Sequence, residues 1–358
     1  MARKNHGRTR RGTIGALSGA ALLLASSACA SPPHPNAEGD LILKFGDSFS
    51  ATHPIGAGGV TPFIDTLQER GDDLGLDVEY FASGQMGKQR DMAALLRSGV
   101  IQLGAVSPAY VGTELPLSNV GDLPGLISDA CTGADAVLAT MQEGGTLFEE
   151  ELEPRGIRPL WVAVVPHYEA MTAGLPVQDP SDLDGEILRS TGGVADRVVD
   201  EVGAAGVSMP LGDLYEAISR KTVAGTLASP ASIGSYKLGE VLHYSTEDAR
   251  LGAFTVTFSI SEDVWDMLDD DQRDLLREAG EAAQDGACKA IEEEQAQALK
   301  EMRQQGVRIH EITDGERAAW DELAEPVREN WVSDLESTGR PASEVLTEFE
   351  TALEETRR

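Results

Sequence analysis

Apolar residues form short runs along the first part of the chain, separated by glycine-containing turns and by segments with helical spacing. The runs that predict buried strands are "LILKFGDS" (41–48), "LDVEYF" (76–81) and "IQLGAVSP" (101–108). Between them, apolar positions recur every three to four residues at Phe63, Ile64 and Leu67, and again at Met92, Leu95 and Leu96. Strands that alternate with helices in this way predict a mainly parallel sheet with helices on both faces.

A second set of such units begins with "GIRPLWVAVVPH" at 156–167, the most strand-like run in the chain. It continues through "DGEILRS" (184–190), "AGVSMP" (205–210), "AISRKTVAG" (217–225) and "RLGAFTVTFSIS" (250–261). After Ser261 the pattern changes to long helical segments up to about residue 305, followed by an acidic helical tail. The glycine-rich segment "HPIGAGG" (53–59) is predicted to be a loop. The whole pattern predicts an α/β protein with two lobes and added C-terminal helices.

The first 28 residues have the order of an export signal. Five basic residues are followed by a short apolar run and by small residues that end at Cys29. The "SSAC" sequence resembles a bacterial lipoprotein signal, although Ser26 stands where an aliphatic residue is usual. We expect Cys29 to carry a lipid, and the alternative is simple cleavage with release. The polar, proline-rich residues 29–39 predict a flexible tether.

Charge and cysteine content narrow the class of protein. The net charge is −31, and removal of residues 1–28 leaves 24 basic and 60 acidic residues, a net charge of −36. Such a surface repels phosphate backbones and anionic headgroups, so we expect no nucleic-acid partner and membrane association only through a lipid anchor. With Cys29 set aside, Cys131 and Cys288 are a candidate disulfide pair in an oxidising compartment, although the sequence cannot show that they meet.

The sequence shows no clustered catalytic or metal-binding motif. The six histidines are scattered, no pair has zinc-site spacing, and neither a nucleophile elbow nor a phosphate-binding loop with its lysine occurs. The acidic runs "DDDQRD" and "EEEQAQ" are predicted to be solvated helix faces rather than calcium sites. These observations favour a binding protein without cofactor or metal over an enzyme.

Two stretches resemble a known family. The first is "DLDGEILRST … GVSMPLGDLYEAISRKTVAGTLASPASIGSYKLGEVLHYST", between Asp182 and Thr246. The second is "YFASGQMGKQRDMAALLRSGVIQLGAVSPAYVGTELPLSNVGDLPGL", at 80–126. Together they resemble the DctP-like extracytoplasmic solute-binding subunits of tripartite ATP-independent periplasmic (TRAP) transporters, over roughly residues 40–305. The resemblance implies a periplasmic-binding-protein-like (type II) fold with a ligand cleft between the lobes.

The same resemblance implies how the ligand is bound. In the motif Asp-Leu-x-Gly-x-x-x-Arg the arginine pairs with the carboxylate of an organic acid, and Arg189 occupies that position. A guanidinium offers two parallel donors to a carboxylate. Further candidate contacts lie on loops at strand ends: Phe49, His53, Gln85, Ser107, Tyr110, His167, Tyr168, Glu169, Ser229 and Pro230. Tyr110 and Tyr168 could stack on a ring, which would suit an aromatic or extended acid.

Two positions depart from the family pattern. Ala224 stands where relatives have an aspartate, and Glu169 lies beside the expected anion site, where it would repel a ligand unless it were protonated or turned away. Glu169 therefore argues against a simple dicarboxylate.

The resemblance also predicts boundaries and partners. We expect lobe 1 at 40–165, lobe 2 at 166–254, a return to lobe 1 with a long helix at 255–305, and C-terminal helices packing on lobe 2 at 306–358. The lobes would close on the organic acid and deliver it to TRAP permease subunits in the membrane. A sensor that presents the same ligand to a membrane receptor is the alternative, and an exported hydrolase has the least support.

Overall fold

The computed structural model describes residue 35 and residues 39–357, so the predicted signal, Cys29 and most of the tether lie outside the described residues. Strands in the described part are β1 Leu41–Gly46, β2 Leu76–Phe81, β3 Leu103–Val106, β4 Ile157–Val165, β5 Glu169–Thr172, β6 Ile187–Ser190, β7 Ala205–Ser208, β8 Gly225–Ala228, β9 Tyr244–Glu247, β10 Phe254–Ser261 and β11 Arg308–Glu311. The α-helices are α1 Thr61–Arg70, α2 Met92–Arg97, α3 Ala130–Thr140, α4 Val194–Glu201, α5 Leu214–Ser219, α6 Glu262–Trp265, α7 Asp270–Gln304, α8 Asp314–Asp321, α9 Ala324–Ser337 and α10 Ala342–Thr356.

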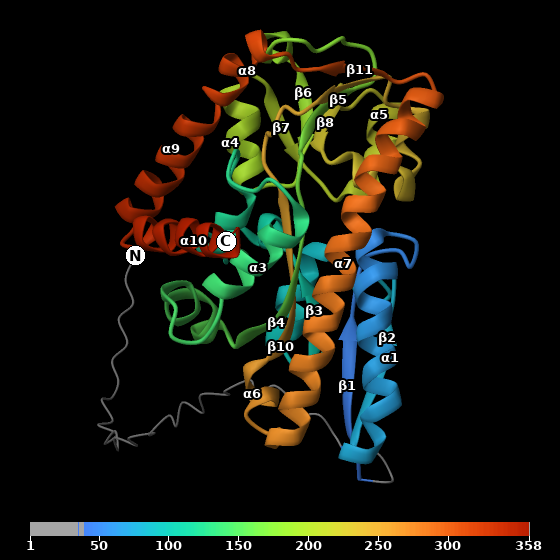
Figure 1. The fold of residues 1–358 in the computed structure, drawn as a ribbon, viewed down its shortest axis with the longest axis vertical. Coiled ribbons are helices and arrows are strands. Elements are labelled where there is room, and N and C mark those ends of the chain that lie inside the picture. Colours follow the sequence, from blue (N-terminus) through green and yellow to red (C-terminus); the bar gives the residue numbers. More distant parts are fainter. Residues whose placement is uncertain (1–34, 36–38, 358) are drawn as a thin grey trace, which may run out of the picture.

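The strands form two sheets, one in each lobe (Figure 1). The first has the order β2-β1-β3-β10-β4 and the second the order β11-β9-β5-β8-β6-β7. Each sheet is mainly parallel, as predicted, with one antiparallel strand: β10 in the first sheet and β5 in the second. Neighbours joined through a helix run parallel, as β1 with β2 and β6 with β7 do, whereas β10 and β5 run antiparallel to both of their neighbours. The antiparallel pairs arise where the chain crosses between the lobes instead of returning through a helix.

Two crossing segments connect the lobes side by side. Residues 166–168 lead from β4 to β5, and residues 248–253 lead back from β9 to β10. The segments are bonded to each other, because Tyr168 N donates to Gly252 O and Leu251 N donates to Tyr168 O. His167, Asp248 and Arg250 have positive φ angles of 57°, 74° and 55°, a conformation that costs free energy in residues other than glycine.

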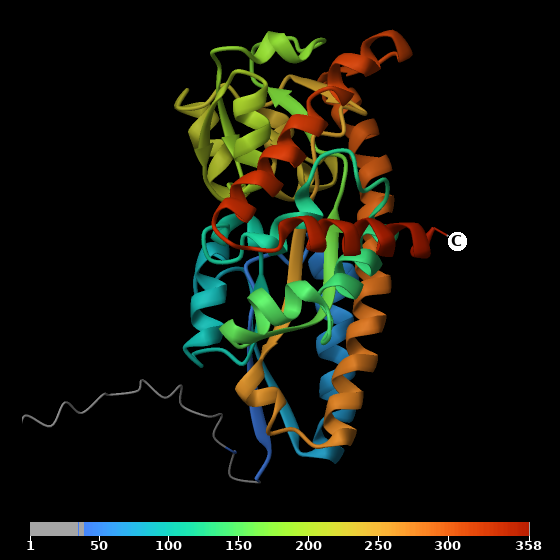
Figure 2. The ribbon, with the colours of Figure 1, turned by 90° about the vertical axis from the view of Figure 1, so that its left-hand side faces the viewer.

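Helix α7 runs along both lobes and ties them together (Figures 1 and 2). It packs on α1, α3 and β4 in the first lobe and on residues 230–232 and β11 in the second. A disulfide between Cys131 on α3 and Cys288 on α7, with 4.9 Å between the Cα atoms, fixes the helix to the first lobe.

The segment "HPIGAGG" was predicted to be a loop, and this is wrong: residues 56–60 form a π-helical turn that leads directly into α1. Tertiary packing explains the difference. A Cβ atom added to Gly58 would lie 2.6 Å from the Gly286 carbonyl oxygen, and one added to Gly59 would lie 2.7 Å from the Trp161 ring. The glycines therefore allow this segment to pack closely against α7, and they are not needed to form a turn.

The C-terminal segment contacts both lobes, which differs from the predicted packing on lobe 2 alone. Residues 308–311 add β11 to the second sheet, and α9 packs on α4. Helix α10 instead crosses back onto α3 in the first lobe, where Glu348 accepts hydrogen bonds from the backbone and hydroxyl of Thr146. Its buried residues Val345, Phe349 and Leu353 recur at helical spacing and extend the first core.

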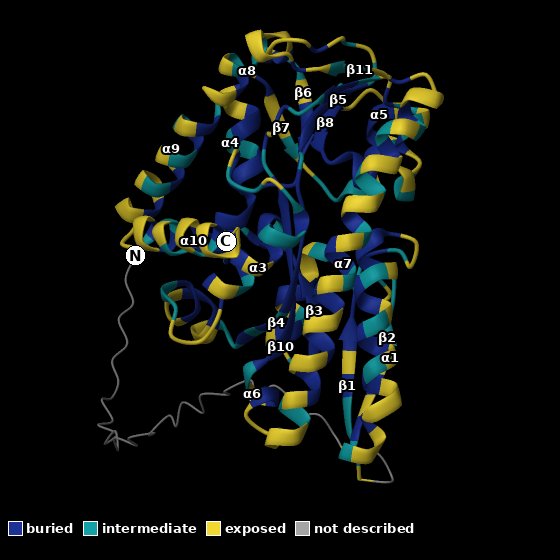
Figure 3. Cartoon of the chain, viewed as in Figure 1, coloured by how far each residue is buried: buried dark blue, intermediate teal, exposed yellow. Residues whose placement is uncertain are grey.

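The sheets form the buried centre of each lobe, and the outer helix faces are exposed (Figure 3). A smaller separate core, which includes Met171, Leu214 and Leu242, fills the second lobe beneath α5. Among the helices that the structure describes, none is both long and apolar enough to cross a bilayer.

Candidate functional site

The candidate site lies where loops at the ends of β1 and β3 meet the second lobe. Arg189 stands on β6, a strand flanked by β7 and β8, and its side chain is buried with a relative exposure of 1%. Nε donates to Met209 O at 2.9 Å and Nη1 donates to Leu227 O at 3.4 Å. Nη2 donates across the lobe interface to Tyr110 Oη at 2.9 Å. These bonds use three of the five N–H donors of a guanidinium, and the Tyr168 hydroxyl is a further hydrogen-bond partner of the same group.

Arg189 has no carboxylate partner within the described residues. The ion pairs found there join other side chains, and Arg189 is the only lysine or arginine of the described chain in the buried class. A buried charge is costly unless it is paired, and carbonyl oxygens offset only part of that cost. The arrangement therefore favours an anion at the lobe interface.

Three tyrosines surround the guanidinium. Tyr110 comes from the first lobe, whereas Tyr168 lies on the crossing segment and Tyr236 follows β8. Burial raises the pKa of all three phenols, and the positive charge of Arg189 opposes this rise without cancelling it. Their hydroxyl groups therefore stay protonated and neutral. The ring of Tyr110 also packs edge-on against Phe254, with 5.8 Å between the ring centroids.

His53 and Phe49 lie together on the loop after β1. Their rings are 4.9 Å apart, and His53 faces Tyr236 at 6.2 Å. Ile55 N donates to His53 Nδ1 at 3.2 Å, so the proton of the neutral ring is on Nε2, which lies 3.3 Å from Ser232 Oγ of the second lobe. Burial lowers the pKa of His53 to about 3, which keeps the ring uncharged at neutral pH.

Other predicted contacts lie at the edge of this cluster or away from it. Gln85 is exposed, and Gln89 instead donates to Ser107 Oγ at 2.6 Å. Ser229 and Pro230 are buried, but the Ser229 hydroxyl donates to Gln295 Oε1 of α7 at 2.9 Å. Hence Gln85 and Ser229 do not converge on Arg189.

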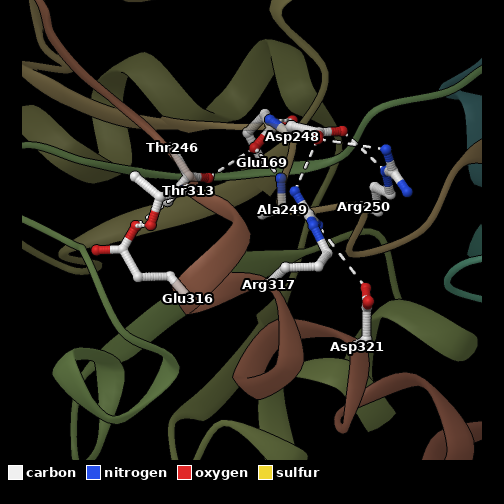
Figure 4. A network of polar contacts seen from close by, with 9 residues as sticks. All are labelled: Glu169, Thr246, Asp248, Ala249, Arg250, Thr313, Glu316, Arg317 and Asp321. Carbon is white, nitrogen blue, oxygen red and sulfur yellow. Dashed lines mark hydrogen bonds and ion pairs between the residues drawn. The ribbon is translucent and has the colours of Figure 1, made fainter.

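The Glu169 carboxylate faces Thr246 and the start of the second crossing segment (Figure 4). Its carboxylate accepts hydrogen bonds from Thr246 Oγ1 at 2.7 Å, Asp248 N at 2.9 Å and Ala249 N at 3.0 Å. Burial raises its pKa to about 7, although these bonds lower it. Glu169 therefore holds the second crossing segment in place, which is the turned-away arrangement for which no repulsion of a ligand is expected.

His167 and Glu169 line the same cavity of about 330 Å³, together with Glu247, Asp248 and Glu292. No three histidine, cysteine or acidic side chains are grouped as metal ligands anywhere in residues 39–357.

Ala224, the second departure from the family pattern, contributes only backbone hydrogen bonds. Its N–H donates to Ile187 O and its carbonyl accepts from Ala173 N.

A second cavity, also of about 330 Å³, lies between the lobes beside Tyr110. Asn119 lines it from the first lobe, and Gly192, Gly193 and Arg197 line it from the second. Arg197 is held by an ion pair of 2.7 Å with Asp334 on α9.

Sequence reasoning missed Tyr236, Ser232 and Gln89. Tyr236 begins the "YKLGEV" motif, which was a usable signal, but its position between Arg189 and His53 depends on the turn after β8. The Met209 and Leu227 carbonyls could not be found from side-chain types, because any residue supplies the same acceptor.

Comparisons with known proteins agree on one family. The model of the family described as bacterial extracellular solute-binding protein, family 7, matches residues 45–334. The C4-dicarboxylate-binding periplasmic protein DctP of Rhodobacter capsulatus is 29% identical over 333 residues, covering 90% of this chain and 93% of the relative.

Solved structures share the fold. A TRAP solute-binding protein from a marine metagenome, specific for aromatic acid ligands and bound to 3-hydroxybenzoate, superposes with a TM-score of 0.81 at 19% identity, covering 89% of this chain and 99% of that chain. A TRAP periplasmic solute-binding protein from Bordetella bronchiseptica with bound mandelate gives a TM-score of 0.78 at 22% identity, covering 88% and 99%. The chain thus has the two-lobed, type II-like binding-protein fold.

Proposed function

Because this chain belongs to family 7 of the bacterial extracellular solute-binding proteins, the DctP-like substrate-binding subunits of TRAP transporters, we propose that it captures a small organic acid through Arg189 and delivers it to a TRAP permease. The observation that carries the proposal is the buried guanidinium, which has no ion-pair partner within the described residues and is contacted there by neutral oxygen atoms. A carboxylate would supply the missing negative charge, and it can accept from a guanidinium through two parallel N–H groups.

Capture proceeds by closure of the lobes. Arg189, Met209 and Leu227 belong to the second lobe, whereas Tyr110 and His53 come from the first, so the full set of contacts exists only when the lobes meet. Closure removes water from around the ion pair and strengthens it. The paired crossing segments at 166–168 and 248–253 act as the hinge, together with the end of α7.

The family is extracytoplasmic, and a lipid on Cys29 would keep the protein beside the permease. Family membership favours transport over the sensor alternative, because both would use the same fold but the relatives are transporter subunits.

Calorimetric titration of the purified protein with a panel of organic acids tests the proposal. Arg189→Ala should weaken binding by about thirty-fold to several thousand-fold, which corresponds to roughly 2 to 5 kcal/mol for the loss of a buried charged contact. Arg158→Ala is the matched control, because Arg158 is partly buried but pairs with Glu262 within the first lobe. Equal ligand affinity in the wild-type and Arg189→Ala proteins would overturn the role of Arg189, and the absence of binding by any acid would overturn the function.

A further inference from the structure

Arg189 is the only buried lysine or arginine of residues 39–357. Two other basic residues at the lobe interface already have acidic partners. Lys88, in the first-lobe glycine turn, is half exposed and pairs with Asp213 at 3.1 Å, and Arg197, which lines the cavity beside Tyr110, pairs with Asp334 at 2.7 Å. An acid enclosed against Arg189 therefore meets one cation whose charge is not already compensated. A second carboxylate buried beside it would have no counter-charge.

His53 supplies a hydrogen bond rather than a charge. Its Nδ1 already accepts from Ile55 N, and its Nε2 faces Ser232 Oγ across the interface. To become cationic, the ring would need a proton on Nδ1, where the Ile55 N–H group already points. Burial at 2% exposure without a carboxylate partner also opposes protonation.

The other ionisable groups near the guanidinium are neutral or acidic. The tyrosine hydroxyls of Tyr110, Tyr168 and Tyr236 are neutral donors and acceptors. Three carboxyl groups act on these tyrosines electrostatically: Asp47 on Tyr236, Asp122 on Tyr168 and Asp213 on Tyr110. None of these acidic groups would stabilise a second anion.

We infer that the ligand of this chain is a monocarboxylate with an uncharged body, which excludes C4-dicarboxylates even though a relative of 29% identity is named for binding them. The inference rests on the proposed function and sharpens it. Arg189 holds the single carboxylate, and the neutral surface formed by Phe49, His53, Tyr110, Tyr168 and Tyr236 encloses the remainder through ring contacts and uncharged hydrogen bonds.

Pairs of acids with the same skeleton show how affinity depends on the number of carboxylates when the size of the ligand stays the same. Each diacid is titrated beside the same skeleton with one carboxylate replaced by a primary amide: succinate with succinamate, glutarate with glutaramate, and terephthalate with 4-carbamoylbenzoate. Mandelate and 3-hydroxybenzoate complete the panel. The tightest acid found in any wider screen is then compared with the same skeleton bearing one more or one fewer carboxylate.

We expect the monoacid of the best-binding pair to exceed the diacid in affinity by at least thirty-fold. A diacid that binds as tightly as its monoacid, with Arg189→Ala abolishing both, would overturn the inference and leave the proposed function standing. If no acid binds at all, the proposed function fails as well.

Discussion

Arg189 on β6 and Tyr110 in the turn after β3 join the two lobes through one hydrogen bond, with 2.9 Å between Nη2 and Oη. Tyr110 thereby supplies the contact to Nη2, whereas Met209 O and Leu227 O of the second lobe hold the Nε and Nη1 atoms. The residue that we propose binds the carboxylate is therefore also contacted from the opposite lobe, so we expect lobe closure and ligand orientation to be coupled.

Tyr110→Phe should therefore weaken acid binding by roughly ten- to a hundred-fold, since hydrogen bonds to charged groups contribute about 1.5 to 3 kcal/mol. The loss should lie mainly in the dissociation rate, because the bond forms only after the lobes meet. Stopped-flow fluorescence with the tightest acid measures both rates. Tyr215→Phe is the matched control, because its hydroxyl donates to Glu240 within the second lobe. Equal dissociation rates in the two variants would contradict the role of Tyr110.

The sequence was sufficient for the parts of the site that depend on local patterns. Helix α1 buries Phe63, Ile64 and Leu67, as their spacing predicts, and the run "DGEILRS" contains the strand β6. Both features are set by residues within about ten positions of each other, and such short-range patterns are visible in one sequence.

Features that depend on packing between distant segments could not be read in the same way. Tyr168 faces the guanidinium and Glu169 faces Thr246. The alternation of side chains along an extended chain predicts only that these neighbours point in opposite directions, and the local sequence does not show which of them faces the ligand. The helical geometry of "HPIGAGG" depends on α7, more than 200 residues later in the chain. The strand β11 depends on pairing with β9, since its short sequence is only weakly strand-like.

The substitution Gly193→Ala tests whether close contact between the lobes is needed for binding. It has a φ of +58°, and a Cβ atom there would lie 2.3 Å from Asn119 Oδ1 of the first lobe. Gly193→Ala should hold the lobes apart, lower acid affinity at least tenfold, and increase the radius of gyration in small-angle scattering with ligand present. Gly185→Ala is the control, because Gly185 also has a positive φ of +74° but nothing within 4 Å of its added Cβ. Both should lose about 1 to 2 kcal/mol of stability from the backbone conformation, and only Gly193→Ala should lose affinity.

The Cys131–Cys288 disulfide should affect stability without affecting binding. It joins residues 157 positions apart, and the enclosed segment contains β4 to β10, including most of the second sheet. Loop-closure entropy gives an upper figure of roughly 5 kcal/mol for a loop of this length. The double variant Cys131→Ala with Cys288→Ala should lower the melting temperature in calorimetry, while acid affinity, measured below that temperature, changes less than about threefold. A large loss of affinity would mean that α7 must be fixed to the first lobe for closure.

Asp122 should make the protein less stable as the pH rises. It is buried at 4% exposure, Oδ1 accepts from Thr255 N at 2.7 Å, and Oδ2 has no hydrogen-bond partner within the described residues. Desolvation raises its pKa from 3.8 to about 7, although the bonds to Thr255 lower it. The folded state therefore binds this proton more tightly than the unfolded chain does.

The sign of the effect follows from that difference. Below about pH 4 the carboxyl group is protonated in both states and costs nothing, whereas between pH 4 and pH 7 the unfolded chain releases the proton first and folding becomes progressively less favourable. Above pH 7 the full penalty applies, on the order of 4 kcal/mol at 1.36 kcal/mol per pKa unit. Asp47, with a pKa raised to about 6, and Glu169, with a pKa raised to about 7, add to the same trend.

Asp122→Asn removes one of these groups with little change in shape, so the stability of this variant relative to wild type should increase steadily from pH 5 to pH 8. Urea denaturation at each pH measures the free energy of unfolding directly. Asp77→Asn, on the exposed face of β2, should show no such increase. If the Asp122→Asn difference in stability were constant between pH 5 and pH 8, Asp122 would be ionised in the folded protein, which would contradict the prediction.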